Sequence, residues 1–263
     1  MPAILDPYRP GGSALHRTDA RVKLALAVLG ILITAALPAG AWPAFVLLLA
    51  AVLSLAALSG LGLTFTLRRG WIALPFMLAA VPLLFTTPGT PLGSLRLGGW
   101  TLTLSSPGVE RFLSIALKSY LSVQVAVLLT STTHFTDLLV AMRAVRVPRL
   151  LVGIFALMWR YLFLLAHEAG RLRIARDARS ARIGPRSGGT LTWRARVAGG
   201  MVGNLFLRGY ERSERVYQAM LARGYDGEIR ALPVASLSRR EWLLLAGGAC
   251  LLSFLFLLGL LFG

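Results

Sequence analysis

Two short segments of the sequence share the pattern Ala-x-x-Ala-Arg followed by a small residue. The first ends in Ala178-Arg179-Ser180 and the second, 44 residues later, in Ala222-Arg223-Gly224. A guanidinium group presents a planar fork of donors that fits a carboxylate, and small neighbouring residues let the backbone of a partner come close. A single Arg at a helix end would also interact favourably with its own helix dipole. Because the pattern occurs twice, we interpret it as a paired docking device for another protein.

The segment that carries both patterns is strongly basic. Residues 132–240 hold 19 of the 28 basic residues and 7 of the 11 acidic ones, so they contribute +12 of the net charge of +17. Apolar periodicity and the stop at Pro148 predict three helices in this segment, over about 136–147, 149–180 and 191–223. The two Arg patterns therefore fall at the C-terminal ends of the second and third helices.

Two glycines, Gly199 and Gly203, lie early in the third of these helices. Glycine inside a helix costs about 1 kcal/mol relative to alanine. A small-xxx-small spacing compensates for this cost when another helix crosses at close range. We therefore predict that the two long helices cross at these glycines and form a rigid brace; the alternative is a flexible start to the third helix.

The rest of the chain is apolar enough to lie in a membrane. Hydrophobic residues make up 56% of the sequence and the mean hydropathy is +0.68. Apolar runs close to the ~20 residues that cross a bilayer recur along it. We predict an all-α integral membrane protein with about five transmembrane helices, over residues 22–37, 43–61, 71–87, 109–131 and 242–262. This gives a membrane domain (1–131), a cytoplasmic coupling-helix domain (132–240) and a C-terminal transmembrane helix (241–263).

Two features refine the predicted spans. Pro75 and Pro82 should kink the third span, because proline removes a helix hydrogen bond. Lys118 should face the helix bundle or a wet cavity, since a charge facing lipid would cost at least ~2.5 kcal/mol.

The distribution of Lys and Arg predicts the orientation. Basic residues precede the first span and follow the second, whereas 88–107 contains only Arg96. By the positive-inside rule, the N-terminus and 132–240 are cytoplasmic. The external 88–107 segment alternates around Gly98-Gly99, which indicates a small β-hairpin. The N-terminal residues lack the apolar core of a cleavable signal peptide.

We searched the sequence for catalytic, metal and nucleotide sites. His16, His134 and His167 lie on different predicted elements, and none has a second His or Cys at ligand spacing. Cys250 is the only cysteine, so a disulfide within one chain is excluded. The phosphate-binding pattern Gly-x-x-x-x-Gly-Lys-Ser/Thr is absent. We therefore predict no catalytic residue, no metal site and no bound cofactor in this chain.

Several motifs together match a known family. The chain resembles the transmembrane T component of energy-coupling factor (ECF) transporters, and most resembles CbiQ, the T component of cobalt transporters. The resemblance covers nearly the whole chain and rests on Ser13-Ala14-Leu15-His16, Asp19-Ala20-Arg21-Val22-Lys23, Thr132-Thr133, Val147-Pro148, Arg160-Tyr161 with Glu168, and the two Ala-Arg-small motifs. The first of these two motifs departs from the family pattern in having Ser180 in place of glycine.

The resemblance implies a non-catalytic subunit of an ATP-driven importer in the inner membrane of a prokaryote. Residues Ala178, Arg179 and Ser180, and Ala222, Arg223 and Gly224, would dock on two CbiO-like ATP-binding subunits, which carry ATP and Mg. Their closure would move the coupling helices and reorient a separate CbiM-like substrate-binding subunit, with or without a CbiN-like protein. The implied substrate is cobalt (Co2+), with membrane lipid around the spans and no role for nucleic acid.

Three alternatives remain open at this point. The first is a T component of a nickel or vitamin transporter of the same class. An ordinary ABC permease would carry a Glu-Ala-Ala…Gly loop, which His167-Glu168-Ala169-Gly170 does not supply. A membrane enzyme acting on lipid phosphates would use the Arg cluster to bind head groups.

Overall fold

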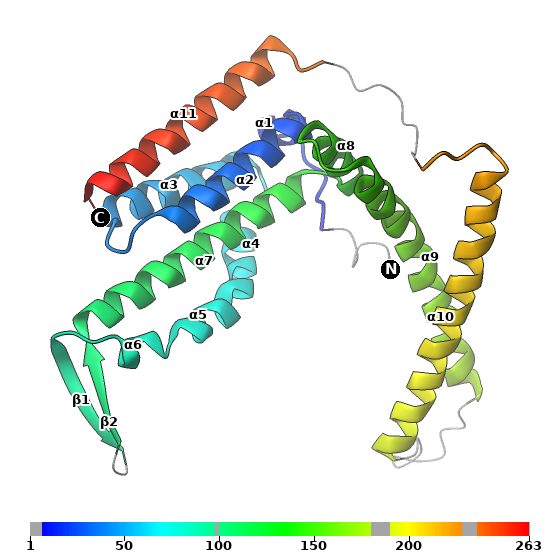
Figure 1. The fold of residues 1–263 in the computed structure, drawn as a ribbon, viewed down its shortest axis with the longest axis horizontal. Helices are drawn as coiled ribbons and strands as arrows, with labels where there is room; N and C mark the ends of the chain where they lie inside the picture. The colour runs from blue at the N-terminus through cyan, green and yellow to red at the C-terminus, as the bar shows by residue number, and fades with distance from the viewer. Residues whose placement is uncertain (1–6, 98–99, 180–189, 228–235, 263) are drawn as a thin grey trace. The chain divides into compact units, whose positions relative to one another are not determined.

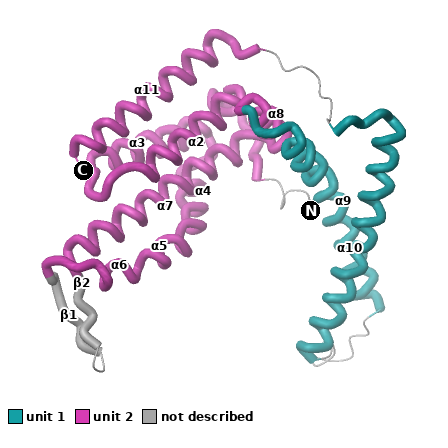
Figure 2. Tube along the Cα trace, viewed as in Figure 1, with its two compact units in different colours: residues 1–5, 146–233 teal, residues 6–145, 234–263 magenta. Residues whose placement is uncertain are grey.

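The computed structural model describes residues 7–97, 100–179, 190–227 and 236–262. The chain divides into two compact units (Figure 2). One comprises Asp6–Val145 and Val234–Gly263 and is called the membrane unit; the other consists mainly of Arg146–Pro233 and is called the helix-pair unit.

The membrane unit is a helical bundle that ends in a short hairpin (Figure 1). Its helices are α1 (Ala14–Arg17), α2 (Ala20–Ala36), α3 (Trp42–Leu58), α4 (Leu63–Arg69), the 3-10 turn η2 (Gly70–Ala73), α5 (Leu74–Ala80), α6 (Leu83–Thr86), α7 (Ser106–Thr132), α8 (Phe135–Ala144) and α11 (Arg239–Phe262). Strands β1 (Pro91–Leu97) and β2 (Trp100–Ser105) pair antiparallel, with Leu97 opposite Trp100. The predicted hairpin is confirmed; Gly98-Gly99 lies outside the described residues.

Long-range contacts fix the direction of each helix in this unit. At one end of α2 the Nζ atom of Lys23 donates to the carbonyl of Thr132 (2.9 Å). At the other end Lys118 donates to the carbonyls of Ala35 (3.2 Å) and Leu37. Helix α7 is therefore antiparallel to α2. Lys118 faces the bundle, as predicted, and caps the carbonyls at the C-terminus of α2, where a cation is favourable.

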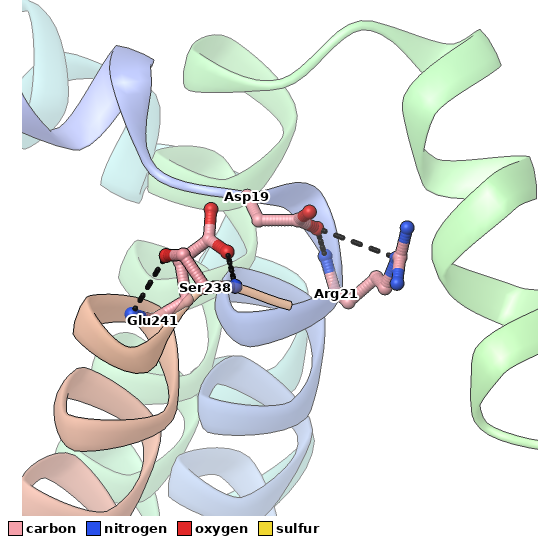
Figure 3. Close-up of polar contacts among 4 residues, drawn as sticks. All are labelled: Asp19, Arg21, Ser238 and Glu241. Atoms are coloured by element: carbon pink, nitrogen blue, oxygen red, sulfur yellow. Dashed lines mark hydrogen bonds and ion pairs between the residues drawn. The ribbon is translucent and has the colours of Figure 1, made fainter. Parts of the chain in front are cut away.

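Helices α2 and α11 begin side by side and run parallel. A Cβ atom on Gly248 would lie 2.8 Å from Leu26, and one on Gly259 would meet Leu37. Both helices have side-chain caps at this shared end (Figure 3). The carboxylate of Asp19 accepts from the backbone N–H of Arg21 (2.7 Å).

The cap of α11 is a capping box. The backbone N–H of Ser238 donates to Glu241 (2.7 Å), and the N–H of Glu241 donates to the Ser238 hydroxyl (3.3 Å) (Figure 3). The two short sequences Asp19-x-Arg21 and Ser238-x-x-Glu241 thus start two helices at the same level of the bundle.

The third predicted span is a broken helix. It extends from Leu63 to Thr86, and its breaks lie near the prolines: Pro75 is in the first turn of α5 and Pro82 is the N-cap of α6. The breaks agree with the predicted kink, and the helix begins at Leu63, eight residues before the predicted start of the span at residue 71. The pair Arg68-Arg69 interrupts the apolar run in the sequence, whereas in the structure it falls within the first helical segment.

Two contacts stabilise this early start of the broken helix. The guanidinium groups of Arg9 and Arg69 lie 3.8 and 5.0 Å from the centre of the Phe65 ring, which are cation–π distances. The buried amide of Gln124 on α7 donates to the carbonyl of Thr66 (3.0 Å).

The core of the membrane unit lies where α2, α3, α7 and α11 meet. Phe45 is 1% exposed at its centre, and the other buried apolar members are Leu37, Ala41, Ala44, Leu48, Val52, Ala56, Leu121, Leu128 and Leu255.

Within the described residues, four helical stretches are long and apolar enough to cross a membrane: Leu63–Thr86, α7, α9 and α11. Helices α2 and α3, with 17 residues each, are at the lower limit of length for a span.

The helix-pair unit contains two long helices, α9 (Arg149–Arg179) and α10 (Leu191–Leu221). Each has 31 residues and so is about 47 Å long. Their bounds agree with the predicted 149–180 and 191–223. The first predicted helix of the segment, 136–147, is α8, but α8 packs on α2 and belongs to the membrane unit. This differs from the predicted division at residue 132.

Candidate coupling interface

The two helices of the pair cross near their midpoints. The Nη1 atom of Arg208 donates to Oε1 of Glu168 (3.1 Å), and Arg171 lies 3.7 Å from the other oxygen of the same carboxylate. At the same level a Cβ atom on Gly209 would lie 3.5 Å from Leu165, an ordinary van der Waals contact. The crossing therefore combines a partly exposed ion pair with one close apolar approach.

The predicted crossing glycines lie elsewhere. A Cβ atom added to Gly199 or Gly203 would meet no atom within 4 Å. These glycines precede Gly209 by ten and six residues, and the contact that the structure places between α9 and α10 is at Gly209. The prediction that α9 crosses α10 at Gly199 and Gly203 thus differs from the geometry of this chain. A small-xxx-small pattern identifies a helix face that another helix can approach closely, but it does not identify that other helix.

An apolar surface on α10 is exposed in the same part of the helix. Val202, Phe206 and Tyr210, at spacings of four residues, are 67%, 70% and 63% exposed. Residues four apart lie on one helix face, and Gly199 and Gly203 fall beside them on that face. Helix α10 therefore has one side against α9 and another, apolar side that the described residues leave uncovered.

The first Arg motif ends α9. Ala178 and Arg179 are both exposed, and Arg179 makes no ion pair or side-chain hydrogen bond within the described ranges. Ser180 lies outside the described residues. A guanidinium group at this helix end is thus available to a partner and lies in the last turn, where its charge also stabilises the helix.

The second Arg motif ends α10 in a Schellman turn. The backbone N–H of Tyr225 donates to the carbonyl of Met220 (3.0 Å), and that of Gly224 donates to Leu221 (2.9 Å). Gly224 has a φ of +78°, a conformation that glycine adopts without strain. The small residue after Arg223 therefore has a local structural role: it turns the chain away from the helix.

The side chain of Arg223 is left at the surface by this turn. Ala222, Arg223 and Gly224 are all exposed, and no ion pair of Arg223 occurs in the part of the chain that the structure describes. The second motif thus offers the same free guanidinium group as the first.

The two motifs lie at opposite ends of the helix pair (Figure 1). Arg179 follows Glu168 by 11 residues and Arg223 follows Arg208 by 15, so each Arg is about 16–23 Å along its helix from the crossing. The structure therefore does not bring the two motifs together into one site. It presents two separate, similar Arg-ended surfaces.

The contacts that sequence reasoning missed are those at the crossing itself. Gly209 was one of several small or apolar positions along α10, and its contact with Leu165 depends on a residue 44 positions away. The pair Glu168–Arg208 joins two helices, so helix periodicity gives no direct sign of it. The sequence analysis noted Glu168 as part of a motif, and this was the only sign that it has a role at the crossing.

The histidines do not form a metal site. The ring of His16 interacts through Nδ1 with the Ser13 hydroxyl (2.7 Å) and through Nε2 with the carbonyl of Arg9 (3.0 Å). Both ring nitrogens thus hold the N-terminal turn together. No group of three or more His, Cys, Asp or Glu side chains suitable for a metal occurs among the described residues.

Comparison with known proteins identifies the class. Residues 11–233 match the family CbiQ, described as cobalt transport protein. The chain is 30% identical over 182 residues to an uncharacterized protein of Methanocaldococcus jannaschii, covering 68% of this chain and 60% of that protein. It is 30% identical over 171 residues to the cobalt transport protein CbiQ of Rhodobacter capsulatus, covering 64% and 66%.

A third relative aligns over more of both chains. The energy-coupling factor transporter transmembrane protein EcfT of Brevibacillus brevis is 30% identical over 233 residues, which is 84% of each protein. For the two relatives above, this chain spans less than two thirds of their length. The fold is that of an all-α, multi-pass membrane protein with a pair of long helices. The chain belongs to the CbiQ family of transport proteins.

Proposed function

We propose that this chain is the transmembrane coupling component of an ECF-type ABC importer. In this role it transmits the ATP-driven motion of two CbiO-like ATP-binding subunits to a separate CbiM-like substrate-binding subunit. The observation that supports this most directly is the pair of exposed guanidinium groups, Arg179 and Arg223, at opposite ends of two crossed helices. Each helix end fits one carboxylate-bearing groove on one ATP-binding subunit.

The chain contributes no catalytic group in this proposal. ATP and Mg belong to the partner subunits, and the crossed helices work as a rigid-body transmission between those subunits and the membrane helices. The apolar face of α10 with Gly199 and Gly203 is suited to contact with a further membrane subunit or with lipid. The proposed location is the inner membrane of a prokaryote.

The arrangement of basic residues supports the proposed orientation. Lys23, Thr132 and Ser238 lie at one end of the bundle, because α2 and α11 are parallel and α7 is antiparallel to them. Most of the basic residues of the membrane unit are near this end, and the helix-pair unit is connected to it. By the positive-inside rule this end is cytoplasmic.

Cobalt (Co2+) is the substrate that the relatives favour. One relative is named cobalt transport protein CbiQ, and one from Methanocorpusculum labreanum is named as a fused cobalt transport protein CbiMQ, of which this chain covers 36% at 27% identity. Such a fusion supports a CbiM-like partner. The metal itself would bind that partner, and nickel or a vitamin remains the alternative substrate class.

The test is co-purification of the ATP-binding subunits with charge-reversed variants. Arg179→Glu and Arg223→Glu should each weaken the association, and the double variant should abolish both co-purification and Co2+ uptake, because a carboxylate would then face carboxylates. The full complex is expressed in membranes, and uptake of radioactive Co2+ and Ni2+ is measured in parallel to distinguish the substrates.

Matched controls carry the same charge change elsewhere on the same helices. Arg173→Glu on α9 and Arg196→Glu on α10 are also exposed, so they should leave co-purification within twofold of the wild type. Full uptake by the double variant, or equal loss in the controls, would overturn the proposed role of the two Arg ends.

A further inference from the structure

The joint between α7 and α8 is made of buried polar residues. Ser131 and Thr132 end α7, Thr133 links the helices, and these three residues are 0%, 2% and 4% exposed. Helix α8 then begins at Phe135 with His134 as its N-cap. The carbonyls of Ser131 and Thr132 have partners outside α7, whereas the buried hydroxyls of Ser131 and Thr133 have none among the described residues.

Residues of the N-terminal segment hold this joint from one side. The backbone N–H of Arg9 donates to the carbonyl of Ser131 (3.0 Å). The ring of Tyr8 lies against the ring of His134, with 3.5 Å between the ring centres. His16 in turn contacts the carbonyl of Arg9 (3.0 Å). The motif around Ser13–His16 therefore orders a segment that contacts the end of α7 and the start of α8.

Lys23 holds the joint from the other side. It is 9% exposed, and its Nζ atom donates to the carbonyl of Thr132 (2.9 Å). Thr132 is the last residue of α7 and lies two residues before His134, the N-cap of α8, so this bond ties the joint before α8 to α2. A buried cation is costly unless it is hydrogen-bonded, and the bond to Thr132 meets this condition.

We infer that Lys23 is the positioning residue that keeps α8 fixed to the membrane helices during transport. This inference rests on the proposed function. With α8 held, the movement of the helix-pair unit reaches the membrane unit through α8. The chain then bends after α8 and not at the α7–α8 joint.

The backbone just after α8 supports this placement of the turning point. The division between the two units falls between Val145 and Arg146. Arg146 has a φ of +62° and is the only non-glycine residue with positive φ in the described ranges. Pro148 then prevents α8 from continuing into α9 as one regular helix. The positive φ of Arg146 and the proline two residues later thus end α8 locally and keep it from extending into the next helix.

The test uses the assembled complex with Lys23→Met, which keeps the length of the side chain and removes its charge and its donors. We expect the ATP-binding subunits to co-purify as in the wild type, because Arg179 and Arg223 are unchanged. Uptake of Co2+ per ATP hydrolysed should fall at least tenfold, because α8 is no longer tied to α2. Arg17→Met, which removes an exposed charge from the same segment, should leave this ratio unchanged.

The ratio of uptake to hydrolysis distinguishes positioning from stability, since a merely unstable chain lowers both in proportion. If Lys23→Met does not assemble, His134→Ala loosens the same joint by removing the ring contact with Tyr8 and keeps the bond from Lys23 to Thr132; it should lower the ratio severalfold. An unchanged ratio in an assembled variant overturns the inference. Failure of the proposed function itself would instead appear as a wild-type chain that binds no ATP-binding subunit.

Discussion

The two units of this protein are stabilised in opposite ways. The membrane unit has a closed core, with Phe45 and Leu121 at 1% exposure and polar ties such as Lys23 to Thr132 at its ends. In the helix-pair unit α10 has no buried residue and α9 has only Val152 and Gly153. Its two helices meet at one crossing.

This difference indicates where each unit obtains its stability. Isolated helices are held mainly by the packing of an apolar face, and α10 has such a face with Phe206 and Tyr210 exposed. Exposed apolar surface of this kind marks contact with a partner or a membrane. Within the described residues both units expose large apolar side chains, but only the membrane unit combines them with a closed core.

The largest expected effect comes from matched Phe→Ala changes in the two units. Phe45→Ala should destabilise the isolated chain by about 3–5 kcal/mol, because it leaves a cavity in a closed core. Phe206→Ala, at a side chain 70% exposed, should change stability by less than about 0.5 kcal/mol. Unfolding in detergent micelles, followed by circular dichroism over a denaturant series, measures both.

The same pair of variants separates self-contained from partner-dependent packing. In the assembled transporter, Phe206→Ala should lower the stability of the complex although it is silent in the isolated chain. Equal effects of the two substitutions in the isolated chain would show that α10 already packs its apolar face, and the contrast between the units would be lost.

Much of this arrangement could be predicted from the sequence because it depends on local patterns. Pro148 and apolar periodicity predicted the bounds of α9 and α10 to within two residues. Ser238 and Glu241 show how such a signal works, since a capping box lies within four residues. Both Arg motifs were also found at helix ends, where the pattern indicated.

What the sequence could not show depends on residues far apart in the chain. The packing of α8 on α2 was not predicted, because these helices begin more than 100 residues apart in the chain and no local pattern links them. The broken helix begins eight residues before the predicted start of the span, because the stacking of Arg69 on Phe65 offsets a charge that normally ends a span. The glycines of α10 identified an approachable face but not its occupant.

A matched pair of glycines gives the next largest effect. Gly259→Val should destabilise the isolated chain by about 1–3 kcal/mol, because the added carbons would meet Leu37 and Ala44 where α11 packs on α2 and α3. Gly203→Val has open space beside it and should be neutral or stabilising by a few tenths of a kcal/mol through helix propensity. Thermal unfolding of the two purified variants checks this order.

In the complex the difference between the effects of the two glycine substitutions should become smaller. If the face at Gly203 meets another helix closely, the valine there will reduce assembly of the substrate-binding subunit, measured by co-purification. A Gly203→Val complex that assembles and transports normally would leave only the propensity effect, and the predicted crossing role of this residue would be wrong.

The smallest expected effect concerns the crossing of α9 and α10. The ion pair Glu168–Arg208 is partly exposed, with side-chain exposures of 31% and 55%, so water screens it. Such pairs contribute about 0.2–1 kcal/mol. Glu168→Gln should therefore cost less than about 1 kcal/mol in the isolated chain.

A double-mutant cycle of Glu168→Gln with Arg208→Gln isolates the pair from other effects of each change. Arg171 lies 3.7 Å from the same carboxylate and can replace part of the lost partner, which lowers the expected coupling energy further. A coupling energy above about 2 kcal/mol would mean that the crossing is held by this pair alone, so that the helix-pair unit would be stabilised from within. A small value means that this ion pair adds little to the crossing, which is then held within the chain mainly by the contact of Gly209 with Leu165.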